Sequence, residues 1–351
     1  MPAPAGKLRR GVATHRGTWV NDLLRTMLTG ISIRQEYLCV AQEELTDTFS
    51  VHLTNRDTPG ALDVTGTHLF LGYRPLVLAI PFADADSAAA RAAEVCLGFQ
   101  AGAFIADSTW RGFPTARDSI ARLHLKKIQE RRMGDRLLVF YEGVRGAHRL
   151  LGPFHRFMNG WLEQLKRRPE GNVALDPNLY EQVRIAYSLP RIISLVSVDD
   201  RERMNLFPTD LHGPVGDAHY ASSLRIGGRA CEQVEAGRRI VISEIAADAF
   251  ELAYRLGKNH MKPAQERAAF ELHPSPSATL GLGVPAAVTR YRELEWYEHL
   301  DCGIHRVFLY RVLRDARVAG GPRLAHLHKC YAQWRADRGL STRYLLRQRS
   351  S

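Results

Sequence analysis

The fold of this chain is decided by the stretch Leu282-Gly-Val-Pro-Ala-Ala-Val-Thr-Arg-Tyr-Arg-Glu-Leu-Glu-Trp-Tyr-Glu-His-Leu-Asp-Cys-Gly-Ile-His-Arg-Val-Phe-Leu-Tyr-Arg-Val-Leu313. A Gly-Pro turn opens it, an amphipathic run follows, and a Cys-Gly turn leads into an apolar strand that begins at His305. Apolar runs separated by glycine-containing turns are typical of antiparallel strands. The stretch therefore predicts the closing part of a small antiparallel barrel whose strand ends supply a binding site.

The composition is that of a water-soluble protein of two domains. The chain has 351 residues, of which 45% are hydrophobic and 24% charged. Its five cysteines are widely spaced and form no Cys-x-x-Cys pair, which is typical of reduced thiols in the cytoplasm. The apolar runs are too short for a signal peptide or a bilayer span, so we expect a cytoplasmic protein with no membrane partner.

The formal net charge is +11, which is compatible with nucleic acid, a membrane surface or anionic cofactors as partners. The basic residues are scattered, with short clusters such as Lys126-Lys127 and Arg131-Arg132, and no nucleic-acid-binding motif accompanies them. We therefore expect a solvated basic surface and no nucleic-acid partner. Attraction of a phosphorylated cofactor is the second interpretation.

Periodicity and turn residues predict the order of elements. In the first half, helices are expected over 19–28, 87–99, 115–132 and 148–165, and strands over 37–40, 49–53, 67–71, 76–80 and 136–141. A polar passage at 169–178 then indicates a connection between an α+β domain, 1–178, and a second domain, 179–351. In the second domain, strands are expected over 192–198, 220–226, 239–243 and 299–314, and helices over 230–235, 248–256 and 324–335. The sequence shows no convincing internal repeat.

From Ile192 onward, the order of elements resembles the flavin reductase-like family, the FMN-binding split barrels. The resemblance covers residues 187–331 and rests on the order and spacing of short motifs. These are Pro190 before a strand and Asn205 after it, the segment 206–212, a loop and short helix at 223–237, Gly283-Val-Pro285, Leu294-Glu295 and Gly303-Ile-His305.

The resemblance implies a split β-barrel that binds FMN or FAD, takes electrons from NAD(P)H and forms a homodimer. It also implies that the flavin is held by the following residues: Asn205, Pro208, Thr209, Asp210, Arg225, Gly228, Arg229 and Ser243. The sequence departs from the family pattern at three places. Gly228 and Ala230 stand where the family has Ser and Thr for the phosphate, Ile304 stands where it has Asp, and Ser243 where it often has Asn.

The residues themselves leave two readings of these positions open. Gly227-Gly228 before a helix lets backbone N–H groups approach an anion, and Arg225 and Arg229 could pair with phosphate oxygens. The alternative is an ordinary turn with exposed arginines. Asn205, Thr209 and Asp210 could equally form turn hydrogen bonds around a proline.

The remaining candidate functional residues are histidines. His305 matches the histidine of the family motif, so the resemblance implies a catalytic role near the flavin, although a structural histidine is the alternative. His326-x-His328-x-Cys330 could suggest a metal site, but these residues fall in a predicted helix, where positions two apart diverge. We therefore expect no metal. No Gly-x-Gly-x-x-Gly motif occurs, so a nicotinamide would not bind on a Rossmann domain.

Three functions remain open. The first is an NAD(P)H:flavin reductase that delivers reduced flavin to a partner oxygenase. The second is a flavin-dependent oxidase or oxygenase for a small organic substrate, with a pocket that the N-terminal domain helps to form. Its lining would come from the aromatic residues of that domain, Trp110, Phe113, Phe154, Phe157 and Trp161. The third is a split barrel that binds no cofactor and serves as a binding module.

Overall fold

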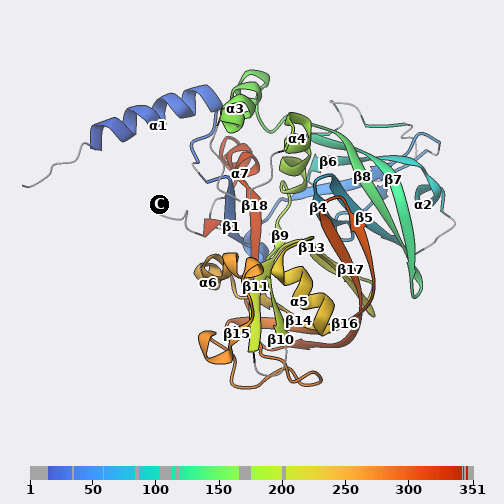
Figure 1. Ribbon diagram of the computed structural model, residues 1–351. Helices are drawn as coiled ribbons and strands as arrows, with labels where there is room; N and C mark the ends of the chain where they lie inside the picture. The colour runs from blue at the N-terminus through green and yellow to red at the C-terminus, as the bar shows by residue number, and fades with distance from the viewer. Residues whose placement is uncertain are drawn as a thin grey trace, which may run out of the picture.

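The computed structural model describes residues 15–33, 35–57, 59–83, 87–102, 112–114, 117, 119–165, 175–199, 203–341, 343 and 345–346. Three antiparallel sheets dominate it, and the helices lie around them (Figure 1). The predicted mainly β class is confirmed. None of the helices in these ranges is long and apolar enough to cross a membrane.

The second half of the chain forms an eight-stranded sheet in the order β12-β13-β17-β16-β14-β10-β11-β15. Its strands are β10 (Ser194–Asp199), β11 (Arg203–Thr209), β12 (His212–Val215), β13 (His219–Arg225), β14 (Arg239–Ile245), β15 (Gln265–Glu266), β16 (Val288–Cys302) and β17 (His305–Arg317). The hairpin β16–β17 is the closing stretch of the sequence, and its turn places Gly303 at φ +63°, where glycine is favoured.

The eight-stranded sheet curls around its own core, as a barrel does. Alternate side chains of six strands point to the same interior, because successive residues of a strand face opposite sides. The interior is formed by Val196, Phe207, Tyr220, Ile242, Leu294 and Phe308, with further neighbours from the same strands. The predicted short helix is present as α5 (Arg229–Gly237), and its Ala230, Cys231 and Val234 complete this core.

The first half forms a seven-stranded sheet in the order β3-β2-β6-β7-β8-β5-β4. Its strands are β2 (Phe49–Thr54), β3 (Leu62–Asp63), β4 (Leu69–Tyr73), β5 (Leu76–Phe82), β6 (Glu94–Ala101), β7 (Ala121–Met133) and β8 (Arg136–His148). The helices predicted over 87–99 and 115–132 are therefore wrong, apart from one turn, α2 (Ala88–Arg91). Val95, Leu97 and Phe99 alternate into the core of this half, as do Ala121, Leu123 and Leu125, so burial here follows the period of a strand.

A third sheet, in the order β19-β1-β18-β9, joins segments from both ends of the chain. It contains β1 (Tyr37–Ala41), β9 (Arg191–Ile192), β18 (Leu324–His328) and β19 (Leu345–Leu346). The helix predicted over 324–335 is wrong in its first part, because residues 324–328 pair with β1, and only α7 (Lys329–Ala336) is helical. This sheet fixes the C-terminal segment against the N-terminal half.

Four further helices cover the sheets: α1 (His15–Thr29), α3 (Pro153–Leu165), α4 (Pro177–Ala186) and α6 (Phe250–Leu256). Short 3-10 turns lie at Gln42–Glu44, Ala247–Ala249, Gly257–Met261 and Arg267–Ala269. Pro153 begins α3, and Ala249 is the N-cap of α6. The predicted domain boundary at 178 falls inside α4, which packs on β8 where Gly143 and Gly146 leave room for Gln182.

Candidate functional site

The two halves of the chain meet through a continuous apolar layer. Outward-facing side chains of the two curled sheets form it, and they are almost fully buried. From the first half come Leu69, Leu71, Val77, Ala79, Met133, Leu138 and Phe140, and from the second Val215, Ala221, Leu300, Cys302, Val307 and Leu309. The candidate site lies at one end of this layer.

His305, the first residue of β17, lies directly at the junction of the halves. It is 1% exposed, it pairs across the ladder with Arg225 of β13, and its ring meets Tyr73 of β4 edge-on, with the ring centroids 4.5 Å apart. Gly72 lies beside this contact, since a Cβ there would be 3.4 Å from Nδ1 of His305. Burial and the nearby Arg225 guanidinium lower the pKa of His305 to about 4. The imidazole is therefore neutral at pH 7, and its buried Nδ1 has no hydrogen-bond partner among the described residues.

The loop from β13 into α5 lies beside His305. Ile226 N–H donates to the carbonyl of Ile304 at 2.9 Å, which joins this loop to the β16–β17 turn. Gly227 has φ +78°, and Gly228 is the N-cap of α5 without a capping side chain, so the first N–H groups of the helix receive no side-chain acceptor from their cap. A Cβ on Gly228 would lie 3.1 Å from the carbonyl oxygen of Arg225. The loop thus combines a cation, Arg225, with a helix N-terminus that no side chain caps, which is the composition of an anion site.

Asp210 follows β11 and belongs to a second, adjacent set of polar groups. Its carboxylate accepts hydrogen bonds from the hydroxyl of Tyr187 at 2.9 Å and from Nδ1 of His326 at 2.8 Å. Burial opposes the charge of Asp210, but the hydrogen bond from His326 and its charge outweigh burial, so the pKa of Asp210 lies below its ordinary value. The same pair raises the pKa of His326 to about 10 against the opposing effect of burial. At pH 7, Asp210 and His326 are therefore an ion pair.

Tyr73 connects these two sets. Burial raises the pKa of Tyr73; the Arg225 charge acts against this increase, and the Asp210 charge adds to it. Tyr73 is therefore within electrostatic range of both residues while its ring touches His305. We call Tyr73, Asp210, Arg225 and His305 the His305 site. Three of its members were predicted from the sequence, and Tyr73 was not.

The other predicted residues are placed differently. Asn205 is completely buried, and its amide donates to Gln233 Oε1 at 2.8 Å and to the carbonyl of Asn259 at 2.9 Å, so it has a structural role. Ser243 is buried on β14 opposite Leu195 and Tyr291.

Pro208 and Thr209 form the half-buried end of β11 immediately before Asp210, and the hydroxyl of Thr209 accepts from Leu211 N–H at 3.3 Å. Arg229 is mostly exposed and pairs with Glu232 on its own helix at 2.8 Å. The structure therefore brings the predicted loop residues near the site, but it directs Arg229 away from it.

The histidine pair that suggested a metal has other partners. His326 and His328 lie on β18 and its end, where His326 binds Asp210 and His328 accepts from Cys330 N–H at 3.1 Å. Within the described ranges, no cluster of three or more His, Cys, Asp or Glu residues is arranged to hold a metal ion. His326 was missed as a site residue because the sequence pattern assigned it to a helix.

The aromatic residues expected to line a substrate pocket are dispersed. Trp110 lies outside the described residues. Phe113 meets His124 edge-on and lies under the guanidinium of Arg56 in the first half. Phe157 and Trp161 of α3 border a surface groove of about 480 Å³ with α4, and both side chains are roughly half or more exposed. Phe113 does not line this groove, so the described residues of the set do not share it.

Comparison with known proteins gives matches of structure only. No protein-family model matches the chain, and no curated protein matches it. An FMN-binding protein from Thermus thermophilus is 19% identical over 46% of this chain and 88% of its own, with a TM-score of 0.36. The NADH:FAD oxidoreductase SgcE6 from Streptomyces globisporus is 13% identical over 46% of this chain and 95% of its own, with a TM-score of 0.38.

BorF, the flavin reductase component of a bacterial two-component tryptophan halogenase, is 16% identical over 43% of this chain and 94% of its own, with a TM-score of 0.38. The solved structures that the chain resembles over part of its length thus include flavin reductases and FMN-binding proteins, as the sequence motifs predicted.

Proposed function

We propose that the chain is a flavin-dependent oxidoreductase that binds FMN, or FAD, at the His305 site and transfers hydride from NAD(P)H to the flavin. The observation that carries the proposal is His305 itself. It is a buried, neutral imidazole whose Nδ1 has no hydrogen-bond partner in the described part of the chain, and it lies between Arg225 and Tyr73 beside the glycine-capped start of α5. A buried polar atom without a partner costs free energy, and a ligand that supplies the partner recovers it.

The residues present fit the parts of a flavin. Arg225 and the first N–H groups of α5 would hold the phosphate, because a guanidinium and a helix N-terminus both favour an anion. Tyr73 offers aromatic surface, and Asp210 is held in place by Tyr187 and His326. When bound, the flavin supplies the redox chemistry by accepting hydride from the nicotinamide.

The chain then has to position and shield the reacting groups, since hydride transfer needs no protein acid or base. His305 stays neutral down to about pH 4, so it can orient a bound group by a hydrogen bond without adding charge. The apolar layer between the halves excludes water from one side of the site. Delivery of reduced flavin to a partner oxygenase and the cytoplasmic location stay predictions.

Two measurements test the proposal. The absorption spectrum of the protein as purified, or after incubation with FMN or FAD and desalting, should show the visible flavin band. Addition of NADH or NADPH under nitrogen should then bleach that band. Bound flavin that neither nucleotide reduces would exclude the reductase and favour action on an organic substrate. No affinity for either flavin would favour the cofactor-free binding module.

A further inference from the structure

We propose that residues 49–148 are a second copy of the barrel formed by residues 194–317, and that the two copies pair about a pseudo-two-fold axis within one chain. The His305 site then lies between copies and is completed in cis by Tyr73 of the first copy, with one flavin per chain. The flavin part of this inference rests on the proposed function, and the duplication does not.

The order of strands is the same in both halves. In the first sheet, β4-β5-β8-β7-β6-β2-β3 are neighbours, and in the second β12-β13-β17-β16-β14-β10-β11 are neighbours in that order. Along the chain, the strands at corresponding sheet positions also follow one another in the same order. Each half has a short helix in the same place, α2 between β5 and β6 and α5 between β13 and β14. An order of seven strands and a helix that recurs in this way indicates one fold used twice.

The long hairpins agree residue by residue. Met133 and Arg136 close the hairpin β7–β8, and Cys302 and His305 close β16–β17, so the two turns are offset by 169 residues, the difference between 133 and 302. Each ladder contains two bulges. The unpaired residues are Ile128 and Val144 in the first hairpin and Tyr297 and Leu313 in the second, and both pairs have the same offset of 169 residues. Because bulges are specific features of a fold, their coincidence supports duplication.

The cores agree as well. With the offset of 169 residues, Leu125, Val139 and Tyr141 correspond to Leu294, Phe308 and Tyr310, and each set lies inside its own curled sheet. Met133, Leu138 and Phe140 correspond in turn to Cys302, Val307 and Leu309, and all six belong to the layer between the halves. Inward and outward positions are therefore conserved between the copies, although few side chains are identical.

The contacts between copies are reciprocal, as a two-fold axis requires. The turn of β16–β17 lies against the β4–β5 turn, where a Cβ on Gly303 would be 2.2 Å from the carbonyl oxygen of Arg74. The turn of β7–β8 lies against the end of the β12–β13 turn, where a Cβ on Gly134 would be 3.0 Å from His219. Leu69 of β4 meets Gly213 of β12, the residue at the corresponding ladder position, so the axis passes near this pair.

The axis relates the His305 site to a second position between the halves, which has different chemistry. Arg136 stands there in place of His305, and Gly216 follows Val215 where Tyr73 follows Gly72. Both Arg136 and Gly216 line a cavity of about 1020 Å³.

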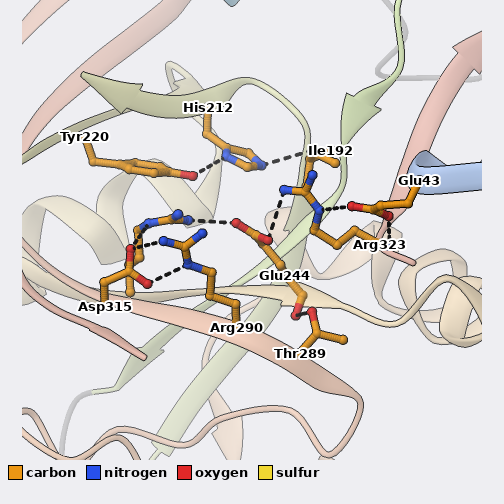
Figure 2. A network of polar contacts seen from close by, with 10 residues as sticks. Glu43, Ile192, His212, Tyr220, Glu244, Thr289, Arg290, Asp315 and Arg323 are labelled. Carbon is orange, nitrogen blue, oxygen red and sulfur yellow. Dashed lines mark hydrogen bonds and ion pairs between the residues drawn. The ribbon is translucent and has the colours of Figure 1, made fainter. Parts of the chain in front are cut away.

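A chain of ion pairs forms the wall of this cavity (Figure 2). Arg292 binds Asp315 and Glu244 at 2.8 Å each, and Arg323 continues the chain from Glu244 to Glu43. This wall offers paired charges instead of a neutral imidazole and an aromatic ring. We therefore assign the flavin to the His305 site alone.

The test combines stoichiometry with matched variants of the full chain. Analytical ultracentrifugation with FMN should show a species with the mass of a single chain and one flavin. Tyr73→Ala in the first copy should weaken FMN binding at least tenfold, and Arg136→Ala at the related position should change it by less than twofold. Two flavins per chain, equal effects of the variants, or flavin bound only by a two-chain species would each overturn the inference.

Failure of the proposed function gives a distinct result. If no flavin binds but the chain sediments as a stable single-chain species, the cofactor assignment fails while pairing of the copies in cis is supported. If the flavin-free chain forms an obligate dimer whose dissociation unfolds it, pairing in cis is overturned.

Discussion

The turns of the two long hairpins, β7–β8 and β16–β17, have a similar backbone at their glycines but different chemistry in the residues that follow. Gly303-Ile304-His305 is packed against the Arg74 carbonyl and leads into a buried, neutral histidine beside Tyr73. Gly134-Asp135-Arg136 is packed against His219 and leads into an arginine that borders an open cavity. The fold therefore sets where a residue stands, and the surroundings of that position decide which chemistry it can perform.

The surroundings differ in the side chains that the third sheet, its flanking residues and α4 contribute to each position. Tyr187 follows α4 and His326 belongs to β18, and both bind Asp210 on the His305 side. On the related side, the sheet face stays polar, and Glu244, Arg292 and Asp315 neutralise one another. One position is thus enclosed by aromatic side chains and a single ion pair, and the other by a charged network.

The largest effect on the free energy of unfolding is expected from Gly303→Ala, when it is compared with the same substitution at Gly134. Gly303→Ala places a Cβ 2.2 Å from the Arg74 carbonyl oxygen and 2.3 Å from Pro75 in a residue with φ +63°, so backbone must move. We expect a loss of about 4 kcal/mol or more in the free energy of unfolding. Gly134→Ala has the same φ but meets only the His219 ring, which can rotate away, so we expect about 1–2 kcal/mol. Urea unfolding of both variants measures the difference, and equal losses would show that the turns are not packed as described.

The next largest effect concerns the charged wall. Arg292→Met removes the cation between Glu244 and Asp315 and leaves the buried Glu244 carboxylate with Arg323 only, which should cost about 3 kcal/mol. Leu123 is the corresponding residue of the first copy and is apolar. The double variant Arg292→Met with Glu244→Gln should therefore recover part of the loss in thermal and urea unfolding. If the double variant loses more free energy of unfolding than the two single variants lose together, the network is not the reason for the loss.

Sequence reasoning recovered the second half far better than the first. Glycines and prolines mark the turns of β13, β14, β16 and β17, and short apolar runs between them have a clear strand period. In the first half, β7 carries Lys, Arg, Gln and Glu along its outer part, so its apolar spacing fitted a charged helix equally well. The duplication could not be recognised from the sequence. A curled sheet needs apolar residues at alternating inward and outward positions, but it does not need particular side chains at those positions.

The sequence predicted those residues of the candidate site that belong to one segment of the chain. It did not predict the residue that a second, distant segment contributes. Asp210, Arg225 and His305 lie within the stretch that has the family motifs. Tyr73 enters from β4, more than a hundred residues earlier, and its contact with His305 depends on how the halves pair. Asn205 was predicted from the same motifs, and in the structure its side chain donates to Gln233 and to the backbone of Asn259.

A smaller effect should appear as a dependence of stability on pH. Because Asp210 raises the pKa of folded His326 from 6.5 to about 10, the ion pair contributes fully below pH 6.5 and is lost as the pH rises through 10. The free energy of unfolding should therefore fall by about 1–3 kcal/mol across this window. Unfolding measured at several pH values for the parent chain and for His326→Gln provides the test, and the variant should lose this slope. A slope of the same size in His326→Gln would assign it to another group.

The smallest effect is expected at the two arginines of the phosphate loop. Arg229 is mostly exposed and bound to Glu232, so Arg229→Gln should change stability by less than about 1 kcal/mol and flavin affinity by less than twofold. Arg225 pairs across the ladder with His305 and lowers its pKa, so Arg225→Gln should weaken flavin binding about tenfold or more. The two variants remove the same charge from the same loop, so a flavin titration separates a specific contact from general attraction by a basic surface. Equal weakening by both would mean that overall charge, and not the position of Arg225 beside His305, attracts the cofactor.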